Sequence, residues 1–208
     1  AVGNQGNIGS CVSWAVSYGM IGWWANKLGI LKPFYNRLTH KVVSYDWFHP
    51  MFEFHRIGAT TGDTKPDNPY KGEPIRWGSG NQAALSDLES YGTPPESDYP
   101  GALGLWDYFH EPNLAELASA SRYRIKPGSW AKVFAHDVNT QMSADEIKAL
   151  KAQLHMGHPV ALSILVDTDF RRWGNSGSTA GGKATGVMDG PGSMGNPNHS
   201  VLALGYDT

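Results

Sequence analysis

The sequence contains one cysteine, Cys11, in 208 residues, so the chain cannot form a disulfide with itself. A fold without disulfides has to be held together by a buried core, and a chain of this length can form one large domain or two small lobes. Apolar residues make up 40% of the sequence, including 8 Trp, 9 Tyr and 7 Phe, and supply such a core. Because a lone cysteine is most often a buried packing residue, a chemical role for Cys11 has to be argued from its neighbours.

Charge and hydropathy argue against several classes of partner. The 17 Lys and Arg against 19 Asp and Glu give a net charge of −2, without the basic excess of a nucleic-acid-binding protein, so nucleic acid is not expected as a partner. The longest apolar run, residues 14–25, is too short for a membrane span. The histidines lack the spacing of a zinc site and the glycines lack a phosphate-binding motif, so neither a metal nor a cofactor is expected.

Residues 10–27 are predicted to form a mostly apolar helix, with Ser10 at its N-cap and Gly29 at its end. Cys11 then lies in the first turn of this helix. Backbone N–H groups in a first turn have no partner within the helix, and the helix dipole is positive there, which favours a thiolate over a thiol. The position therefore suits a nucleophile.

Two more helices are predicted further along the chain. Residues 81–91 have apolar side chains at helical spacing, and Gly92 ends the segment; the expected buried face consists of Ala84, Leu85, Leu88 and Tyr91. Ser143 and Glu146 form a capping box that begins the third helix, which ends at Gly157; its expected apolar positions are Ile147, Leu150 and Leu154.

Residues 159–166 and 200–206 are predicted to be buried strands. Helices thus dominate the first half of the chain and strands the second, an order typical of the α+β class. The intervening residues 174–198 are rich in Gly, Ser, Asn and Pro, and a loop of this length in a compact domain is usually functional or mobile.

The residues before Cys11 form a glycine-rich turn, Asn-Gln-Gly-Asn-Ile-Gly-Ser-Cys over residues 4–11, with the Gln5 amide six residues ahead of the thiol. This segment resembles the active-site segment of the papain-like (C1) cysteine peptidases. The resemblance implies that Cys11 is the nucleophile. It also implies that Gln5 and the Cys11 backbone N–H stabilise the oxyanion that forms when a peptide carbonyl is attacked.

A second segment, Asn-His-Ser-Val-Leu-Ala-Leu-Gly-Tyr over residues 198–206, resembles the family's Asn/Asp-His-Ala-Val stretch. An isolated histidine at the start of a strand is more often structural than catalytic. Here, however, His199 opens an apolar strand after a long loop, where its ring could face a cleft. The resemblance implies that His199 is the general base for Cys11 and that Asn198 beside it contacts substrate.

Weaker similarities to the family join these two segments. Residues 85–100 and 147–166 resemble scaffold segments, and Gly78, Ser79 and Gly80 take the place of a stretch that binds substrate backbone. The resemblance spans nearly the whole chain. It implies a single papain-like catalytic domain over residues 1–208, with a mostly helical lobe to about residue 125, a β-rich lobe over residues 126–208 and the active-site cleft between them.

The sequence also departs from the family pattern. Ile8 and Val12 stand where many relatives have a disulfide cysteine and a tryptophan, which implies the disulfide-free, bacterial type of the family. The family's orienting Asn, in an Asn-Ser-Trp-Gly segment, has no counterpart in residues 1–208. Both ends of the domain look trimmed. We therefore expect the chain to be the core of a longer protein in which flanking domains or a second chain supply this Asn.

The function expected from these residues is that of a thiol protease, a hydrolase that cleaves a peptide or protein substrate through a thioester acyl-enzyme. Two alternatives remain open. The missing orienting residue and Ser79 fit a catalytically inactive papain-like module that binds peptides or proteins. A thiol-dependent acyltransferase is the other alternative, because an amine can attack the thioester in place of water.

Overall fold

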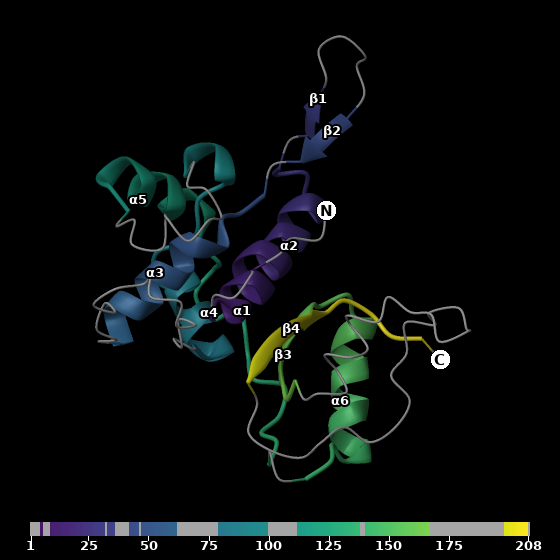
Figure 1. Cartoon of the computed structure of the whole chain (residues 1–208). Helices are drawn as coiled ribbons and strands as arrows, with labels where there is room; N and C mark the ends of the chain where they lie inside the picture. The colour runs from purple at the N-terminus through teal and green to yellow at the C-terminus, as the bar shows by residue number, and fades with distance from the viewer. Residues whose placement is uncertain are drawn as a thin grey trace, which may run out of the picture.

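The computed structural model describes residue 5 and residues 9–31, 33–35, 42–45, 47–61, 79–99, 112–137, 140–166 and 198–207. Over these residues the protein is a mixed α+β structure with two separate two-stranded antiparallel sheets (Figure 1). The predicted α+β class is therefore confirmed at this level. The loop expected over residues 174–198 lies outside the described residues, except for Asn198.

The first helical element is a continuous rod over residues 11–27, named here the N-terminal helix. It consists of α1 (Cys11–Ser13), a π-helical segment η1 (Trp14–Ile21) and α2 (Gly22–Lys27). The sequence predicted this helix but not its wide central turns. The periodicity of apolar residues shows where a helix lies, whereas the hydrogen-bond register inside it depends on the elements packed around it.

The ends of the N-terminal helix lie where the sequence placed them. Ser10 precedes the helix, but its hydroxyl makes no capping hydrogen bond and is buried without a partner among the described residues. At the other end, the Ile30 N–H donates to the Ala25 carbonyl at 2.8 Å while Gly29 has a φ of 66°. This is the Schellman ending, in which glycine adopts the left-handed conformation at low cost.

The remaining elements are β1 (Pro33–Tyr35), β2 (Val42–Tyr45), α3 (Pro50–Thr61), α4 (Asn81–Ser90), η2 (Glu96–Asp98), α5 (Leu114–Ala120), η4 (Ser121–Tyr123), α6 (Ala144–His155), β3 (Val160–Ile164) and β4 (His199–Ala203). α4 and α6 confirm the two other predicted helices. Both hydrogen bonds of the Ser143–Glu146 capping box of α6 are present: the Ser143 N–H donates to the Glu146 carboxylate at 2.7 Å, and the Glu146 N–H donates to the Ser143 hydroxyl at 3.2 Å. α3 and α5 were not predicted, although Asn113 and Glu116 form a capping box at the start of α5.

β3 and β4 pair antiparallel, with Ile164 opposite His199 at one end and Val160 opposite Ala203 at the other. Both strands were predicted, but their predicted burial was wrong: only Val160 in β3 and Ser200 in β4 are buried. The second strand is also shorter than predicted, because β4 ends at Ala203 and Tyr206 is 42% exposed. The register explains the early end. Past Ala203 the facing chain is Pro159, which has no N–H to donate to a sheet.

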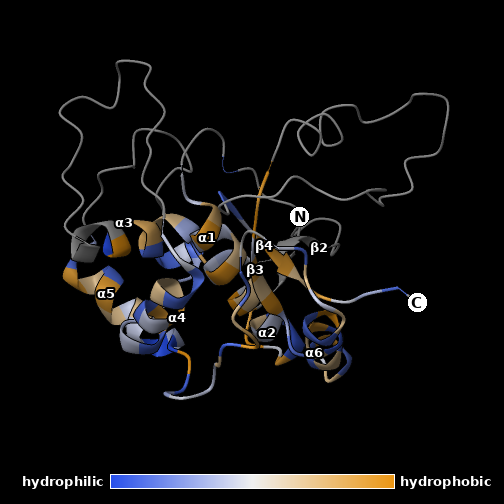
Figure 2. Cartoon of the chain, turned by 90° about the horizontal axis from the view of Figure 1, so that it is seen from below, coloured by the Kyte–Doolittle hydropathy of each residue, from blue (hydrophilic) through white to orange (hydrophobic). Residues whose placement is uncertain are grey.

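The core lies between the N-terminal helix, α3 and α4. Its buried side chains are Val12, Val16, Ile21, Ala25, Phe48, Ile57, Ala84 and Leu88. Two positions expected on buried helix faces are instead exposed, Tyr91 at 46% and Ile147 at 41%. β3 and β4 also contact the N-terminal helix, and α6 packs against β3 (Figure 1). Figure 2 shows apolar stretches of both strands in this position, while α6 carries a mixture of hydrophilic and hydrophobic residues.

One glycine sets how closely the N-terminal helix approaches β4. A Cβ atom at Gly19 would lie 2.9 Å from Cδ2 of Leu202 and 3.3 Å from the Trp14 carbonyl oxygen. A larger residue would force either the Leu202 side chain or the strand that carries it to move. Gly19 therefore allows the helix that carries Cys11 and the strand that carries His199 to pack in direct contact.

Candidate functional site

Cys11 is the first residue of the N-terminal helix, half-buried and with a free thiol. It packs at the margin of the core that includes Val12 and Val16, but it is not enclosed by that core. The first N–H groups of a helix have no partner within the helix, so they remain available to a negative group beside them. The sulfur thus lies at a helix start, where the sequence placed it.

His199 is the first residue of β4 and lies opposite Ile164 of β3. Its side chain is half-buried, and this burial lowers the pKa of the imidazole because the charged form loses solvation. The neutral ring is therefore the favoured form near neutral pH. A neutral imidazole is the form that can accept a proton.

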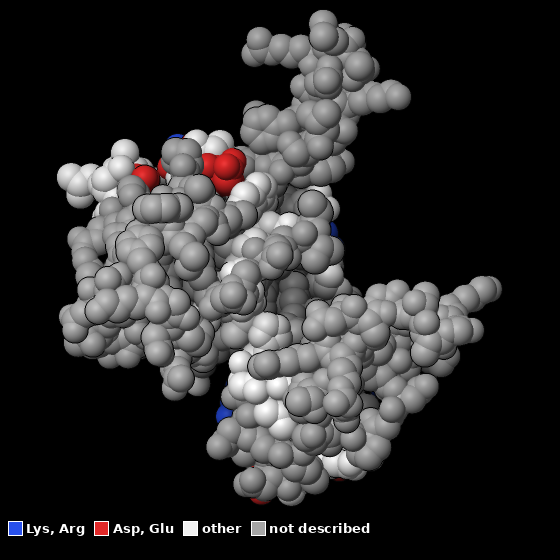
Figure 3. Space-filling view, in the orientation of Figure 1, with Lys and Arg blue, Asp and Glu red and all other residues white. Residues whose placement is uncertain are grey.

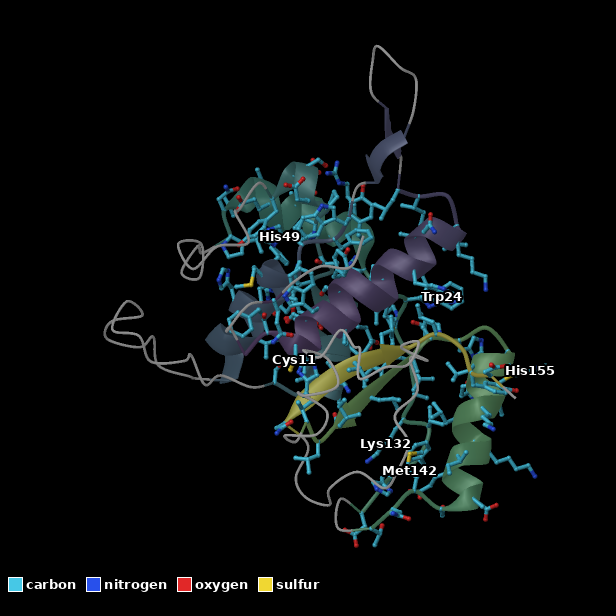
Figure 4. The ribbon with its side chains drawn as sticks, turned by 45° about the vertical axis from the view of Figure 1, so that its right-hand side comes forward. Cys11, Trp24, His49, Lys132, Met142 and His155 are labelled. Carbon is cyan, nitrogen blue, oxygen red and sulfur yellow. The ribbon has the colours of Figure 1, made fainter. Side chains whose placement is uncertain are left out.

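Three element starts converge in the fold. α1 contacts both β4 and α4, and α4 in turn contacts β3. Figure 4 shows Cys11 at the end of the N-terminal helix that lies beside the β3–β4 pair. The candidate site is thus the meeting point of the starts of the N-terminal helix, β4 and α4, and it includes the elements that carry Cys11 and His199.

Asn198 anchors the chain just before His199. Its side-chain oxygen accepts from the Val166 N–H at 2.8 Å, and its side-chain nitrogen donates to the Val166 carbonyl at 3.1 Å. The Asn198 backbone N–H also donates to the Ile164 carbonyl at 3.0 Å. These bonds extend the strand pairing by one step and fix where β4 begins. The predicted contact between Asn198 and substrate stays a prediction.

The other predicted site residues precede the N-terminal helix or α4 in the chain. Gln5 is described and half-buried, but the residues that join it to Gly9 lie outside the described part of the chain. Ser79 and Gly80 directly precede α4 and therefore lie at the candidate site, Ser79 half-buried and Gly80 exposed. Gly78 lies outside the described residues.

Sequence reasoning missed Asn81, the first residue of α4. Its side-chain oxygen accepts from the Ser200 hydroxyl at 2.6 Å, and its side-chain nitrogen donates to the Ser163 hydroxyl at 3.2 Å. The two serines face each other across the strand pair. A signal for this contact was present, because a polar residue in an apolar strand needs a hydrogen-bond partner wherever it is buried, as Ser200 is.

A buried acidic group supports the N-terminal helix from the other side. Glu53 of α3 is fully buried, and Ser17, in the helix that begins at Cys11, donates a hydrogen bond to it. Burial raises the pKa of Glu53 well above its usual range, and the nearby carboxyl of Asp87 raises it further. Burial also raises the pKa of Asp87 to about 6, against the opposing effect of Arg56.

Charge gathers elsewhere on the molecule. In Figure 3 smaller red areas show at the lower edge, and the larger patch of described Asp and Glu side chains on the visible face lies over the end that carries α5. There, Asp98 accepts from Arg122 at 2.7 Å and from Ser119 at 2.6 Å. No three His, Cys, Asp or Glu side chains among the described residues come together as a metal site would require. Likewise, none of the described helices has the length and apolar character needed to cross a membrane.

Comparison with known proteins adds no assignment. No protein-family model matches the chain, and no curated protein is significantly similar to it. The functional argument therefore depends on the residues of the candidate site themselves.

Proposed function

We propose that this chain is a papain-like cysteine peptidase with a two-lobe catalytic domain, in which Cys11 and His199 are the catalytic pair. The observation that carries the proposal is the contact between α1, which begins at a free, half-buried Cys11, and β4, which begins at a half-buried His199. A nucleophile and a base on two elements that meet are the minimum that thiol-dependent acyl transfer requires.

In the proposed reaction, the Cys11 sulfur attacks the peptide carbonyl carbon while the His199 ring takes the thiol proton. Gln5 and the Cys11 backbone N–H donate hydrogen bonds to the carbonyl oxygen as its negative charge develops. The C–N bond then breaks, and the imidazolium gives its proton to the leaving amine. Finally, a water molecule that loses its proton to His199 hydrolyses the thioester and releases the thiol.

The proposed substrate is a peptide or a protein, bound along the Gly78–Gly80 segment and beside Asn198. Among the described residues none hydrogen-bonds the His199 ring. The group that orients the ring therefore has to come from outside the described residues, from another part of the same protein or from a second chain. Without such a group the ring is free to adopt an unproductive tautomer, at a severe cost in rate.

Alkylation of Cys11 by iodoacetamide as a function of pH tests this proposal. A sulfur paired with an imidazole reacts at pH about 5–6, whereas an isolated thiol with a pKa of about 8.5 reacts only slowly there. We expect a rate limb at low pH that disappears in His199→Ala, and a burst of product from a peptide ester that disappears in Cys11→Ser. Free-cysteine behaviour in the unmodified protein would refute the catalytic pair.

The His199 ring has no hydrogen-bond partner among the described residues, and this favours a second candidate, a papain-like module that binds peptides without cleaving them. In such a module the Cys11→Ala variant would bind a peptide from a library as tightly as the unmodified protein does. Neither protein would release a burst of product from a peptide ester. Adding an amine to the burst assay separates the third possibility, since an acyltransferase would form an amide product in place of the free acid.

A further inference from the structure

Asn81 forms a bridge between the core and the strand that carries His199. It begins α4, whose Ala84 and Leu88 are both completely buried in the core. From this position its amide reaches Ser200 of β4 at 2.6 Å and Ser163 of β3 at 3.2 Å. Ser200 is the residue directly after His199, and it is 4% exposed.

We propose that Asn81 is a positioning residue, which holds β4 so that the His199 ring stays in reach of Cys11. This inference rests on the proposed function in one respect, namely that His199 is the base for Cys11. Asn81 touches neither the thiol nor the substrate in this role. It acts through Ser200, by fixing the backbone that carries the imidazole.

The surroundings of His199 show why such a residue is needed. Among the described residues, β3 and β4 form a two-stranded sheet, and one residue of each strand, Val160 and Ser200, is buried. A pair of strands is marginal by itself and takes its stability from what it packs against. The two neighbours of His199 are each held by hydrogen bonds, Asn198 by Val166 and Ser200 by Asn81. His199 is thus fixed from both sides along the chain.

A helix-capping role does not account for the Asn81 side chain. Gly80 occupies the N-cap position of α4, and no side chain makes a capping bond there. Both ends of the Asn81 amide are instead used by the strand pair, the oxygen as acceptor and the nitrogen as donor. Two bonds of opposite sense fix the orientation of the amide as well as its position.

The pH profile of Cys11 alkylation, measured together with the acylation rate on a peptide ester, tests the positioning role. Asn81→Ala is expected to lose the low-pH limb and to acylate about tenfold to a hundredfold more slowly, because a small misplacement of reacting groups has effects of this size. Ser200→Ala, which removes one buried hydroxyl, is expected to give the same phenotype. The double variant Asn81→Ala/Ser200→Ala should acylate no more slowly than either single variant, because all three proteins lack the same Asn81–Ser200 hydrogen bond.

Asn113→Ala is the matched control. It also removes two hydrogen bonds that an asparagine makes at the start of a helix, those from Ala115 and Glu116 at 2.9 and 3.0 Å, but at α5. It should lower the midpoint of thermal unfolding about as much as Asn81→Ala, while the alkylation profile stays that of the unmodified protein. Ser163→Ala removes one of the two Asn81 bonds but keeps the bond from Ser200. Its alkylation rate at low pH should therefore lie between those of Asn81→Ala and Asn113→Ala.

The outcomes separate this inference from the proposed function. If the unmodified protein has no low-pH limb, the catalytic pair fails and the positioning role of Asn81 fails with it. If the unmodified protein has the limb and both Asn81→Ala and Ser200→Ala keep it, only the positioning role is overturned. Equal loss of the limb in Asn113→Ala would also overturn it, because general destabilisation would then explain the effect. Should Asn81→Ala fail to fold, Ser200→Ala alone decides.

Discussion

Two parts of the molecule are packed very differently: the helical part, formed by the N-terminal helix, α3 and α4, and the strand part, formed by β3, β4 and the helix α6 beside them. Around the N-terminal helix, α3 and α4, side chains such as Val16, Phe52 and Leu88 are completely buried. Among the described residues of the part formed by α6, β3 and β4, the most enclosed apolar side chains are Leu154 at 8% and Val160 at 9% exposure. The proposed nucleophile therefore lies on the densely packed part and the proposed base on the thinly packed one.

If Cys11 and His199 act as the proposed pair, this difference means that their geometry depends on the contacts between the two parts. The close approach of Gly19 to Leu202 and the Asn81 bridge to Ser200 are two such contacts. A change inside the helical part should mainly alter stability. A change at the junction should mainly alter the reactivity of Cys11.

Two glycines that end helices give the largest expected contrast. Gly92 after α4 and Gly157 after α6 have φ values of 78° and 77°, but a Cβ at Gly92 would lie 2.1 Å from the Ala120 carbonyl oxygen. At Gly157 the nearest atom is Nζ of Lys27 at 3.4 Å, at the end of a flexible side chain. We expect Gly92→Ala to lower the free energy of unfolding by about 4 kcal/mol and Gly157→Ala by about 1 kcal/mol. Urea unfolding measures both, and equal losses would contradict the packing difference.

Two leucines make the same comparison with a smaller change. Leu88 is completely buried, so its truncation leaves an enclosed cavity, whereas Leu154 is 8% exposed and lies at the edge of its part of the fold. We expect Leu88→Ala to cost about 3–4 kcal/mol and Leu154→Ala about 2 kcal/mol in the free energy of unfolding. A larger cost at Leu154 would mean that the strand part has the firmer core.

Gly19→Ala tests the junction. The new methyl group would meet Leu202, so that this side chain and the strand β4 that carries it have to shift, at a cost of about 1–2 kcal/mol in stability. We expect a disproportionate effect on reactivity, with Cys11 alkylation at pH about 5–6 slowed by about tenfold. Gly22→Ala is the control on the same helix, because nothing lies within 4 Å of a Cβ at that position. A normal low-pH rate in Gly19→Ala would separate helix–strand packing from the reactivity of the thiol.

The two parts should also respond to pH in opposite directions. In the helical part the folded pKa of Glu53 is raised, so its contribution to stability is complete below the unfolded pKa and is lost as pH rises through the folded pKa. Asp87 behaves likewise, up to a folded pKa of about 6. We expect Glu53→Gln to leave stability nearly unchanged at pH about 4 and to stabilise the protein increasingly as pH rises, because glutamine stays neutral. Unfolding curves measured from acid to alkaline pH check this, and a parallel decline in both proteins would contradict it.

In the strand part the sign is reversed at Glu146. The Ser143 backbone and hydroxyl hold the pKa of Glu146 below its usual range, so its contribution is present above the unfolded pKa and is lost as pH falls through the folded pKa. We expect Ser143→Ala to destabilise α6 by about 1 kcal/mol at neutral pH, through loss of the cap, and by less in acid. Hydrogen exchange of the α6 amides measures this effect without interference from the helical part.

Local patterns in the sequence located much of the secondary structure. The Ser143–Glu146 box and the glycines at positions 29, 92 and 157 marked helix ends that the structure confirms. α3 was missed, because its Glu53, His55 and Arg56 interrupt the apolar pattern and are nevertheless buried or half-buried. Their burial depends on partners in other elements, such as Ser17 for Glu53 and Asp87 for Arg56. Propensity and periodicity carry no information on such partners.

The candidate site divides in the same way. The sequence by itself determined that a lone thiol begins a helix and that an imidazole begins a strand, because both facts follow from local spacing and local chemistry. Only the tertiary structure decided that α1 lies against β4 and that Asn81 bridges α4 to Ser200. Contacts between residues more than a hundred positions apart depend on which buried surfaces fit together, and side-chain packing across the whole fold determines that fit.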